Sequence, residues 1–549
     1  MYDQLKNKSI AEQAEFLTRS LVAIKSYNSS QGETEKARFI KKIILSFPYF
    51  QQHASEVWEQ EIPHDPYGRV NIFARIKGKT RKTILFHAHL DTVGTEDYGS
   101  LQEGAHDPDL LEKFFVNFNG DDFIRNEAKS GNWLFGRGAL DMQSGIAVNL
   151  VNLLYFSQQP EPLDGDLLYL FNVDEENQHR GILNAVEELY KMRKSGSHFI
   201  AGINNDFISP MFPEDKNKYI YTGAAGKILP CFYIYGRESH VGDVFHSIDP
   251  THLAADIIHE INHNLQLTER IKGEYTLPPT CLYLKETKKQ YNVQTPVSVK
   301  LYFNYFIYER SPSEVLEDFF LKTINISNRY KNRAKKQFEV FRKQQGFPEI
   351  DLNWSIDVTT LSDYIDKLEA QGINAYDVMK KVYRNQSQGK DEREVAFEII
   401  EVLQQYDSDK SPRIILFFAP PYLPNNDLDQ NDELACKVKS VVESTLKELS
   451  QQVQENFVLR RFFPYLADGS FLSISTDDKD IQTFKKNMPL MDELYSLPIK
   501  KIKELNIPSL NLGVYGKDGH KWTERVYKPY SFGILPKVIQ TVTVELLKI

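Results

Sequence analysis

The chain has 549 residues, which is too long for one simple core, so two or more domains or one domain with a large insertion is expected. Hydrophobic residues make up 41% and charged residues 26%, as in ordinary globular proteins, and the net charge of −9 argues against a general nucleic-acid binder. No uninterrupted apolar run reaches about 18 residues, so no transmembrane helix is expected.

The beginning of the sequence and its cysteines point to a compartment. The first residues lack a basic segment followed by an apolar run, so no signal peptide is expected. Cys231, Cys281 and Cys436 are odd in number and far apart, which argues against a disulfide framework or a CxxC metal knuckle. A reducing cytoplasm fits this pattern best, so we expect a cytoplasmic protein that binds neither nucleic acid nor membrane.

Helix and strand patterns alternate in the N-terminal part of the chain. Ser9 followed by Glu12 forms a capping box that opens an amphipathic helix, and a second helix is expected from Glu33 to about Ser46. Another helix is expected after DMQSG. Strands are expected in GRVNIFARI, KTILFHAHLD and DGDLLYLFNVDEE (68–76, 82–91 and 164–176). Strands that alternate with helices predict an α/β sheet.

The pattern changes after about residue 222, and this change predicts a second domain. Strands are expected in TGAAGKILPCFYIYG, VSVKLYFNYFIYE and PRIILFFAPPY (222–236, 297–309 and 412–422). Ser311-Pro312 is a helix start, and a long charged, helix-favouring section follows. Helix and strand patterns return near the end, with NIPSLNLGVYG and a C-terminal helix. The chain therefore predicts one α/β domain interrupted by an α+β domain.

The string HEINH (259–263) matches the H-E-x-x-H pattern of zinc metalloproteases. On a helical wheel His259 and His263 lie on one polar face with other polar side chains, opposite an apolar face. That is the pattern of a surface helix with a solvated face, and no third-ligand signature follows. We expect both histidines to be dispensable for zinc.

Metal-binding side chains occur in five other segments, of which HAHLDTV is the first. His89 and Asp91 are two residues apart at the end of an expected strand, so their side chains share a face. A carboxylate there can accept the imidazole N–H and orient the ring toward a metal. His87 lies on the same face and is an alternative to His89.

In three of the other four segments the candidate ligands are acidic side chains, and in the fourth the candidate is a histidine. Asp141 stands where a glycine-rich turn enters a helix, and a plain N-cap is its simpler interpretation. Glu175 and Glu176 end a buried apolar strand, where carboxylates are costly unless they are paired or bound. Adjacent side chains diverge, so one can bind metal while the other contacts its water. Asp206 follows a short apolar run and is uninformative alone, and His520 lies in a glycine-rich loop after a strand.

In this order, HxDTV, GRGxxDM and DEE resemble the co-catalytic zinc hydrolases, which include aminoacylase, acetylornithine deacetylase, succinyl-diaminopimelate desuccinylase and carboxypeptidase G. The segments FFAPPYLP, YGRESHVGD and GHKWTERV are similar to arginine-utilisation proteins of the RocB type. The resemblance implies a three-layer α/β zinc-peptidase catalytic domain formed by residues 1–222 and 421–549. It also implies an inserted α+β, ferredoxin-like lid formed by residues 223–420, with hinges near 222 and 420.

The same resemblance implies a di-zinc site, for which Co²⁺ or Mn²⁺ are possible substitutes. One ion would be held by His89 and Asp206 and the other by Glu176 and His520, with Asp141 bridging the two. Each ion then has three protein ligands and needs a water, as in an open catalytic site.

Catalytic roles are implied for three further residues. Glu175 would be the general base, Asp91 would orient His89, and His240 of YGRESHVGD would stabilise the oxyanion. An ordinary hairpin histidine is the simpler interpretation of His240. In relatives this histidine often comes from a partner subunit, but a large lid can permit a monomer, so a homodimer is possible and not assumed.

Three positions depart from the family pattern. Gln143 stands where Lys is common, Asn304 lies near the place of a substrate-binding arginine, and Asp206 replaces the glutamate of deacetylases, as in the aminopeptidase and dipeptidase branch. These departures put simple N-acyl amino-acid deacetylation in question. The segment ADGSF (467–471) is expected to line the substrate site, with a turn as the alternative.

The predicted function is a di-zinc amidohydrolase or peptidase for a small amino-acid derivative or short peptide, with a link to arginine or ornithine catabolism by resemblance only. The alternatives are a catalytically silent ligand-binding or regulatory protein on the same fold and a protease that uses HEINH. All five ligands and the base are present, which argues against the silent protein.

Overall fold

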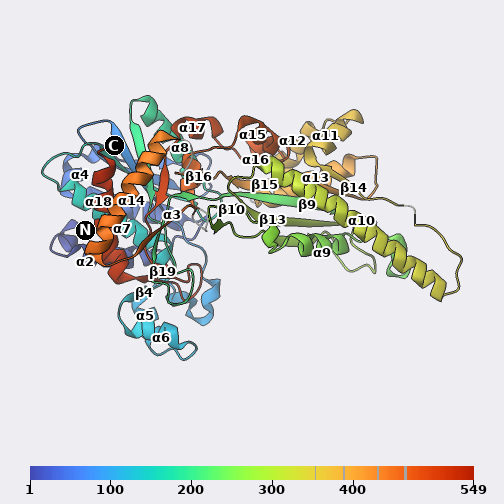
Figure 1. Cartoon of the computed structure of the whole chain (residues 1–549), viewed down its shortest axis with the longest axis horizontal. Helices are drawn as coiled ribbons and strands as arrows, with labels where there is room; N and C mark the ends of the chain where they lie inside the picture. Colours follow the sequence, from blue (N-terminus) through green and yellow to red (C-terminus); the bar gives the residue numbers. More distant parts are fainter. Residues whose placement is uncertain (353, 387–389, 429–431, 463–466) are drawn as a thin grey trace. The chain divides into compact units, whose positions relative to one another are not determined.

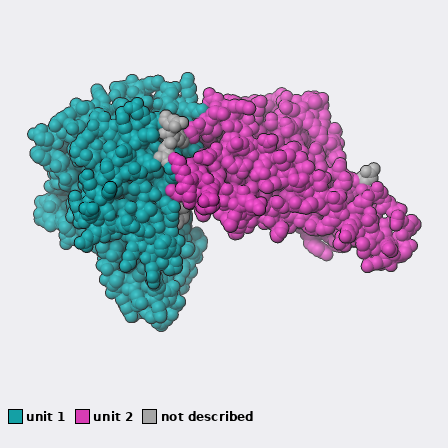
Figure 2. Space-filling view, in the orientation of Figure 1, with its two compact units in different colours: residues 1–224, 425–474, 498–549 teal, residues 225–424, 475–497 magenta. Residues whose placement is uncertain are grey.

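The computed structural model describes the chain except for residues 353, 387–389, 429–431 and 463–466. The described residues divide into two compact units, which Figure 2 shows in different colours. Unit 1 consists of residues 1–224, 425–474 and 498–549, and unit 2 of residues 225–424 and 475–497. The expected hinges lie beside the first two crossings between the units. Segment 475–497 belongs to unit 2, although the sequence analysis placed it in the C-terminal part of the first domain.

Unit 1 is built on an eight-stranded mixed sheet with the order β1-β2-β5-β3-β6-β18-β7-β17. Its strands are β1 (Val57–Glu61), β2 (Val70–Ile76), β3 (Lys82–His89), β5 (Asp166–Asn172), β6 (His198–Asn204), β7 (Lys218–Tyr221), β17 (Phe457–Arg460) and β18 (Ser509–Asn511). Strands β5, β3, β6 and β18 run parallel to their neighbours in this series. Because parallel strands end at the same edge of a sheet, the segments after β3, β5 and β6 lie together.

Helices of unit 1 pack on this sheet, and the expected α/β class is confirmed. The longer helices are α2 (Ile10–Val22), α3 (Gln31–Leu45), α7 (Ser144–Ser157), α8 (Arg180–Lys194), α14 (Glu433–Val453) and α18 (Leu535–Leu546). Helix α7 is buried along almost its whole length because it packs against β2, β3 and β5 as well as against α2 and α18. The predicted capping box of Ser9 and Glu12 begins α2, and a second box, formed by Ser30 and Glu33, begins α3.

Unit 2 contains a five-stranded sheet with the order β12-β13-β9-β15-β14. Its strands are β9 (Gly226–Tyr235), β12 (Thr280–Glu286), β13 (Ser298–Ile307), β14 (Asp357–Thr360) and β15 (Arg413–Leu423). The pairs are antiparallel except that β14 runs parallel to β15. The inserted α+β architecture is therefore confirmed.

Helices lie on both faces of the unit 2 sheet. They are α9 (Pro250–Ile261), α10 (Pro312–Gln344), α11 (Leu361–Ala370), α12 (Ala375–Gln386) and α13 (Glu392–Tyr406). On one face Phe232 of β9 stacks on Phe319 of α10. The neighbouring residue Tyr233 points to the other face and packs in a cluster with Tyr364 and Leu403. Alternation along β9 thus divides its side chains between two helical layers.

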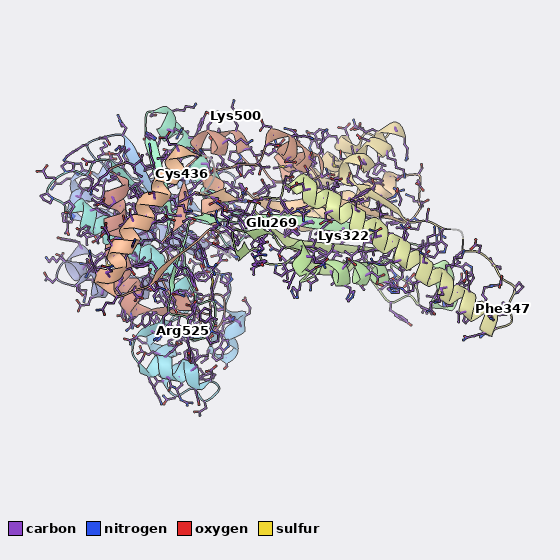
Figure 3. The ribbon with its side chains drawn as sticks, viewed as in Figure 1. Glu269, Lys322, Phe347, Cys436, Lys500 and Arg525 are labelled. Atoms are coloured by element: carbon purple, nitrogen blue, oxygen red, sulfur yellow. The ribbon has the colours of Figure 1, made fainter. Side chains whose placement is uncertain are left out.

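Helix α10 begins at the predicted Ser311-Pro312 start, with a capping box between Ser311 and Glu314. The turn before it is held by Glu269, whose side chain is labelled in Figure 3. The Glu269 carboxylate accepts the backbone N–H groups of Tyr308, Glu309 and Arg310 at 2.8, 2.7 and 3.0 Å. No helix among the described residues is long and apolar enough to cross a membrane.

The HEINH segment differs from the expected continuous helix. Helix α9 ends at Ile261, and His263 lies beyond it with a left-handed φ of 55°. Its polar face is also not simply solvated, because Glu260 pairs with Arg329 of α10 at 2.6 Å (Figure 1 shows α9 beside α10). Neither histidine of HEINH occurs in a metal-capable group among the described residues.

Candidate metal centre

Three of the expected metal-binding segments meet at the carboxyl edge of the unit 1 sheet. His89 is the last residue of β3, Glu175 and Glu176 follow β5, and Asp206 follows β6. Ligand sites of open α/β sheets characteristically lie outside this edge. The order of the strands therefore brings together side chains that are far apart in the sequence, of which His89 and Asp206 are more than 100 residues apart.

A small sheet supplies the other two residues. Asp141 lies in the turn after β4 (Trp133–Phe135), and His520 lies in the loop after β19 (Gly516–Lys517). Both strands pair with β20 (Arg525–Tyr527), in the order β19-β20-β4. Pairing with one shared strand places the two loops beside each other.

Asp141 is the centre of the arrangement. Its Oδ1 lies 3.0 Å from Nε2 of His89, and its Oδ2 lies 2.9 Å from Nε2 of His520. Nε2 of His520 is also 2.9 Å from Oε1 of Glu176. Two three-residue groups, each with all its ligand atoms within 4.8 Å, share Asp141: His89-Asp141-Asp206 and Asp141-Glu176-His520.

The electrostatics of these groups suit a cation. Burial, together with the charge of Asp141, raises the pKa of Asp206 to about 8. Burial and the same neighbouring charge also raise the pKa of Glu176. Burial opposes charge on His520, but hydrogen bonds to Asp141 and Glu176 raise its pKa to about 12. Several buried carboxylates therefore require positive charge, and the oxygen and imidazole donors present are those that divalent metals bind.

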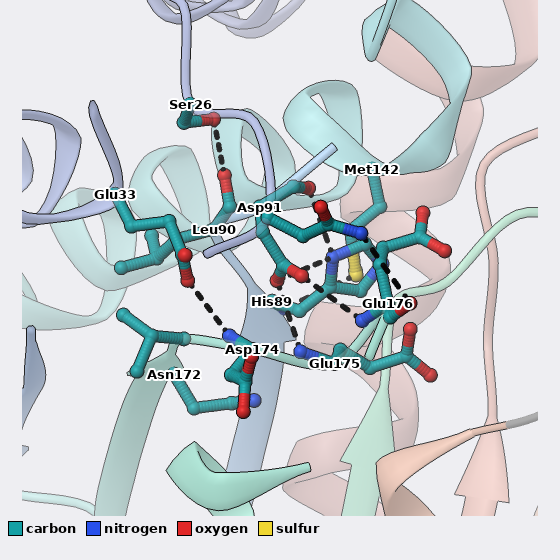
Figure 4. Close-up of polar contacts among 12 residues, drawn as sticks. Ser26, Glu33, His89, Leu90, Asp91, Met142, Asn172, Asp174, Glu175 and Glu176 are labelled. Atoms are coloured by element: carbon teal, nitrogen blue, oxygen red, sulfur yellow. Dashed lines mark hydrogen bonds and ion pairs between the residues drawn. The ribbon is translucent and has the colours of Figure 1, made fainter. Parts of the chain in front are cut away.

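Asp91 contacts both His89 and the turn that carries the two glutamates (Figure 4). Nδ1 of His89 lies 3.2 Å from the backbone carbonyl of Asp91 and 3.5 Å from its Oδ1, so the carbonyl is the nearer acceptor where the carboxylate was predicted to orient the ring. The two carboxylate oxygens of Asp91 also accept the backbone N–H groups of Glu175 and Glu176 at 3.1 and 2.9 Å. The prediction from the sequence covered the contact of Asp91 with His89 and not its contacts with these two backbone N–H groups.

Glu175 is buried, and its Oε1 has no hydrogen-bond partner among the described residues. Burial raises its pKa well above the ordinary value. His179 and Asp468 form a further compact group with Glu175, and neither was predicted from the sequence as a metal or catalytic residue. Nδ1 of His179 lies 2.9 Å from Oδ1 of Asp468. The spacing of four between Glu175 and His179 was the available signal, and Asp468 belongs to the ADGSF segment.

Three further residues were singled out from the sequence. His240 belongs to unit 2, is exposed, and accepts the N–H of Gly242 on Nδ1 at 3.1 Å. Gln143 is buried and donates to the carbonyl of Leu90 at 3.2 Å. His87 is buried, its Nε2 has no partner in the described chain, and burial lowers its pKa to about 4.

The chain is similar to known proteins in sequence and in fold. The model of Peptidase family M28 matches residues 71–225. Protein RocB of Bacillus subtilis (strain 168) is 46% identical over 550 residues, covering 100% of this chain and 97% of that protein. Succinyl-diaminopimelate desuccinylase of Blochmanniella pennsylvanica (strain BPEN) is 28% identical over 231 residues, covering 42% of this chain and 53% of that protein. The M20 family metallo-carboxypeptidase Sso-CP2 of Sulfolobus solfataricus has a TM-score of 0.52 at 11% identity, covering 97% of this chain and 99% of that one.

These matches define the fold class as the metallopeptidase type, with a mixed α/β unit and an inserted α+β unit. Within that class, the full-length similarity places the chain in the same family as Protein RocB. The predicted family resemblance is thereby confirmed.

Proposed function

We propose that the chain is a two-metal hydrolase that cleaves an amide or peptide bond in a small amino-acid derivative or a short peptide. The observation that carries the proposal is that Asp141 presents one carboxylate oxygen to His89 and the other to His520. A carboxylate shared in this way is the bridging ligand that a pair of adjacent ions requires.

His89, Asp141 and Asp206 would hold one ion, and Asp141, Glu176 and His520 the other. Zn²⁺ is the proposed metal because the donors are imidazole and carboxylate, with Co²⁺ and Mn²⁺ as substitutes. When bound, the two ions would polarise the scissile carbonyl and make a water more acidic.

Glu175 is the proposed general base. It would accept a proton from the attacking water as the C–O bond forms, and deliver that proton to the nitrogen as the C–N bond breaks. The buried and unpartnered Oε1 of Glu175 supports this role. Asp91 would keep the base in place, since it accepts the backbone N–H groups of Glu175 and Glu176.

His240 is the proposed donor to the developing oxyanion. Because it belongs to unit 2, this role requires unit 2 to bring it to the site, and the expected hinges near 222 and 420 lie beside the crossings at 224 and 425. The donor would come from the same chain or from a partner subunit. Mixing the inactive variants His240→Ala and His520→Ala distinguishes these cases. Activity returns on mixing only if the site of one subunit receives His240 from the other subunit.

Two comparisons suggest the substrate class. A desuccinylase is among the relatives and a carboxypeptidase among the similar structures, so both deacylation and peptide cleavage are proposed for testing. A place in arginine or ornithine catabolism follows from the resemblance to arginine-utilisation proteins alone. A cytoplasmic location is proposed because the three cysteines are odd in number and far apart in the sequence.

One experiment tests the function. Metal content and hydrolysis of a panel of N-acyl amino acids and dipeptides are measured for the wild type and for Glu175→Ala, His520→Ala and His259→Ala. The proposal requires Glu175→Ala to keep its metal and lose turnover, and His259→Ala to match the wild type. A wild type that binds zinc but hydrolyses nothing in the panel would favour the catalytically silent alternative.

A further inference from the structure

The turn that carries the proposed base and a proposed ligand is held by carboxylates from distant segments. Three consecutive backbone N–H groups, those of residues 174 to 176, each donate to a side-chain carboxylate. Asp91 accepts from Glu175 and Glu176, and Glu33 of α3 accepts from Asp174 at 2.8 Å (Figure 4). The backbone position of both catalytic-site glutamates therefore depends on groups outside the turn.

Glu33 is itself fixed by Arg69. Nη1 of Arg69 lies 3.0 Å from Oε1 of Glu33 and 2.7 Å from Oδ1 of Asp174. The other side of the same guanidinium meets Asp65, with Nε and Nη2 at 2.9 and 2.7 Å from Oδ1. The Arg69 side chain is 2% exposed and those of its three partners are 0% exposed. A planar guanidinium held on two sides is a rigid support.

This support acts on a backbone that would otherwise relax. Asp174 has a left-handed φ of 66°, which a residue with a side chain rarely adopts. Its carbonyl accepts the N–H of His179 at 2.7 Å, so the turn is tight. Strained conformations at functional sites persist only where surrounding contacts determine them. Here those contacts are Glu33 on the N–H and Arg69 on the carboxylate of the strained residue.

We propose that Glu33 and Arg69 are positioning residues of the active site. They hold Asp174 in its left-handed conformation, and through it they set the positions of Glu175 and Glu176. The inference rests on the proposed function, because it gives these two glutamates the roles of base and metal ligand. Neither Glu33 nor Arg69 belongs to a metal-capable group among the described residues, so their effect must pass through the turn.

Two variants test the proposal, and two others serve as matched controls. Glu33→Gln replaces the carboxylate of the support by an amide, and Arg69→Met removes its guanidinium. Glu12→Gln removes the equivalent glutamate of the α2 capping box, which contacts Ser9 and pairs with no arginine among the described residues. Asp407→Asn breaks another buried ion pair, with Arg413 in unit 2. For all four we measure the melting temperature, kcat and KM at saturating metal, and the visible absorption spectrum after loading with Co²⁺ alone.

The expected result separates positioning from stability. Glu33→Gln and Arg69→Met lower kcat by about 10- to 100-fold with KM little changed, the usual effect of losing a partner behind the ligands. Both also change the Co²⁺ spectrum, because Glu176 moves. Asp407→Asn lowers only the melting temperature, and Glu12→Gln changes neither kcat nor the spectrum.

The proposal is overturned if Glu33→Gln and Arg69→Met lose melting temperature as Asp407→Asn does but keep the wild-type kcat and Co²⁺ spectrum. If Arg69→Met does not fold, Glu33→Gln decides alone. A wild type without hydrolysis contradicts the proposed function, and the Co²⁺ spectra of the folded variants still decide whether the support positions Glu176.

Discussion

Arg137 and Glu524 form a buried ion pair with 2.8 Å between Nη1 and Oε2, and this pair anchors the turn that carries Asp141. Oε1 of Glu524 accepts the backbone N–H groups of Leu140 and Asp141 at 3.0 and 3.1 Å. One carboxylate thus connects the start of β20 to the proposed bridging ligand. The position of Asp141 depends on a residue four places after His520 in the sequence.

We expect Glu524→Gln to weaken metal binding by about 10- to 100-fold, because it loosens the support of the bridging carboxylate. It should also lower the free energy of unfolding, since among the described residues Arg137 then keeps only Asp97, at 2.7 Å, as an ion-pair partner. Competition with a zinc chelator and urea unfolding measure the two effects. The exposed pair of Arg19 and Asp109 supplies the control, because Asp109→Asn should change neither quantity. Unchanged zinc affinity in Glu524→Gln would contradict the expectation.

Replacing Glu175 by glutamine tests the proposed base while keeping the size of the side chain. We expect kcat to fall by about 100- to 10,000-fold, the usual contribution of a general base. Metal content should stay at the wild-type level because Glu175 is not one of the five proposed ligands. Metal analysis and steady-state kinetics on the same preparation check both points. Loss of metal together with activity would assign Glu175 to the ligands instead.

His520→Ala tests the proposed metal set against the HEINH motif. We expect this variant to lose most of the metal held by Asp141 and Glu176, because it removes the nitrogen 2.9 Å from an oxygen of each. His259→Ala should retain wild-type zinc, since His259 belongs to a helix that pairs with α10 through Glu260. Elemental analysis after dialysis measures both. Zinc loss in His259→Ala alone would restore the HEINH interpretation.

The sequence could predict the five clustered residues because each follows a local pattern. His89, Glu176 and Asp206 come at the ends of apolar runs, and parallel strands bring such ends together. Asp141 and His520 stand in glycine-rich turns. The metal roles themselves came from the family resemblance and stay a proposal.

The supports of the site could not be predicted because they join segments that share no pattern. Glu33 looks like an ordinary capping-box residue, and its contact with Asp174 crosses 141 positions of sequence. Glu524 reaches back 383 positions to the N–H of Asp141. The end of α9 at Ile261 was missed for a related reason: the residues after it bond to a distant segment, since Asn262 accepts the N–H of Cys281 and the N–H of His263 donates to the carbonyl of Pro279. Recruitment of 475–497 into unit 2 likewise depends on tertiary packing.

The buried pair of Asp407 and Arg413 predicts how acid destabilises unit 2. Burial opposes ionisation of Asp407, but hydrogen bonds from Arg413, the backbone N–H of Asp409 and Gln371 together outweigh it, so the pKa of Asp407 lies below its ordinary value. A carboxyl group whose folded pKa is lowered contributes stability above its unfolded pKa, and that contribution is lost as the pH falls through the folded pKa. Asp407→Asn should therefore cost about 3 kcal/mol at pH 7, because Arg413 remains buried with Asp409, at 2.9 Å, in place of two charged partners. The difference in free energy of unfolding between wild type and variant should stay constant from pH 7 to about 5 and shrink below about pH 4.

Urea unfolding at a series of pH values measures this difference, followed by the fluorescence of Trp354, the tryptophan of unit 2. A difference that grows on acidification would mean that Asp407 binds its proton more tightly in the folded state than in the unfolded one.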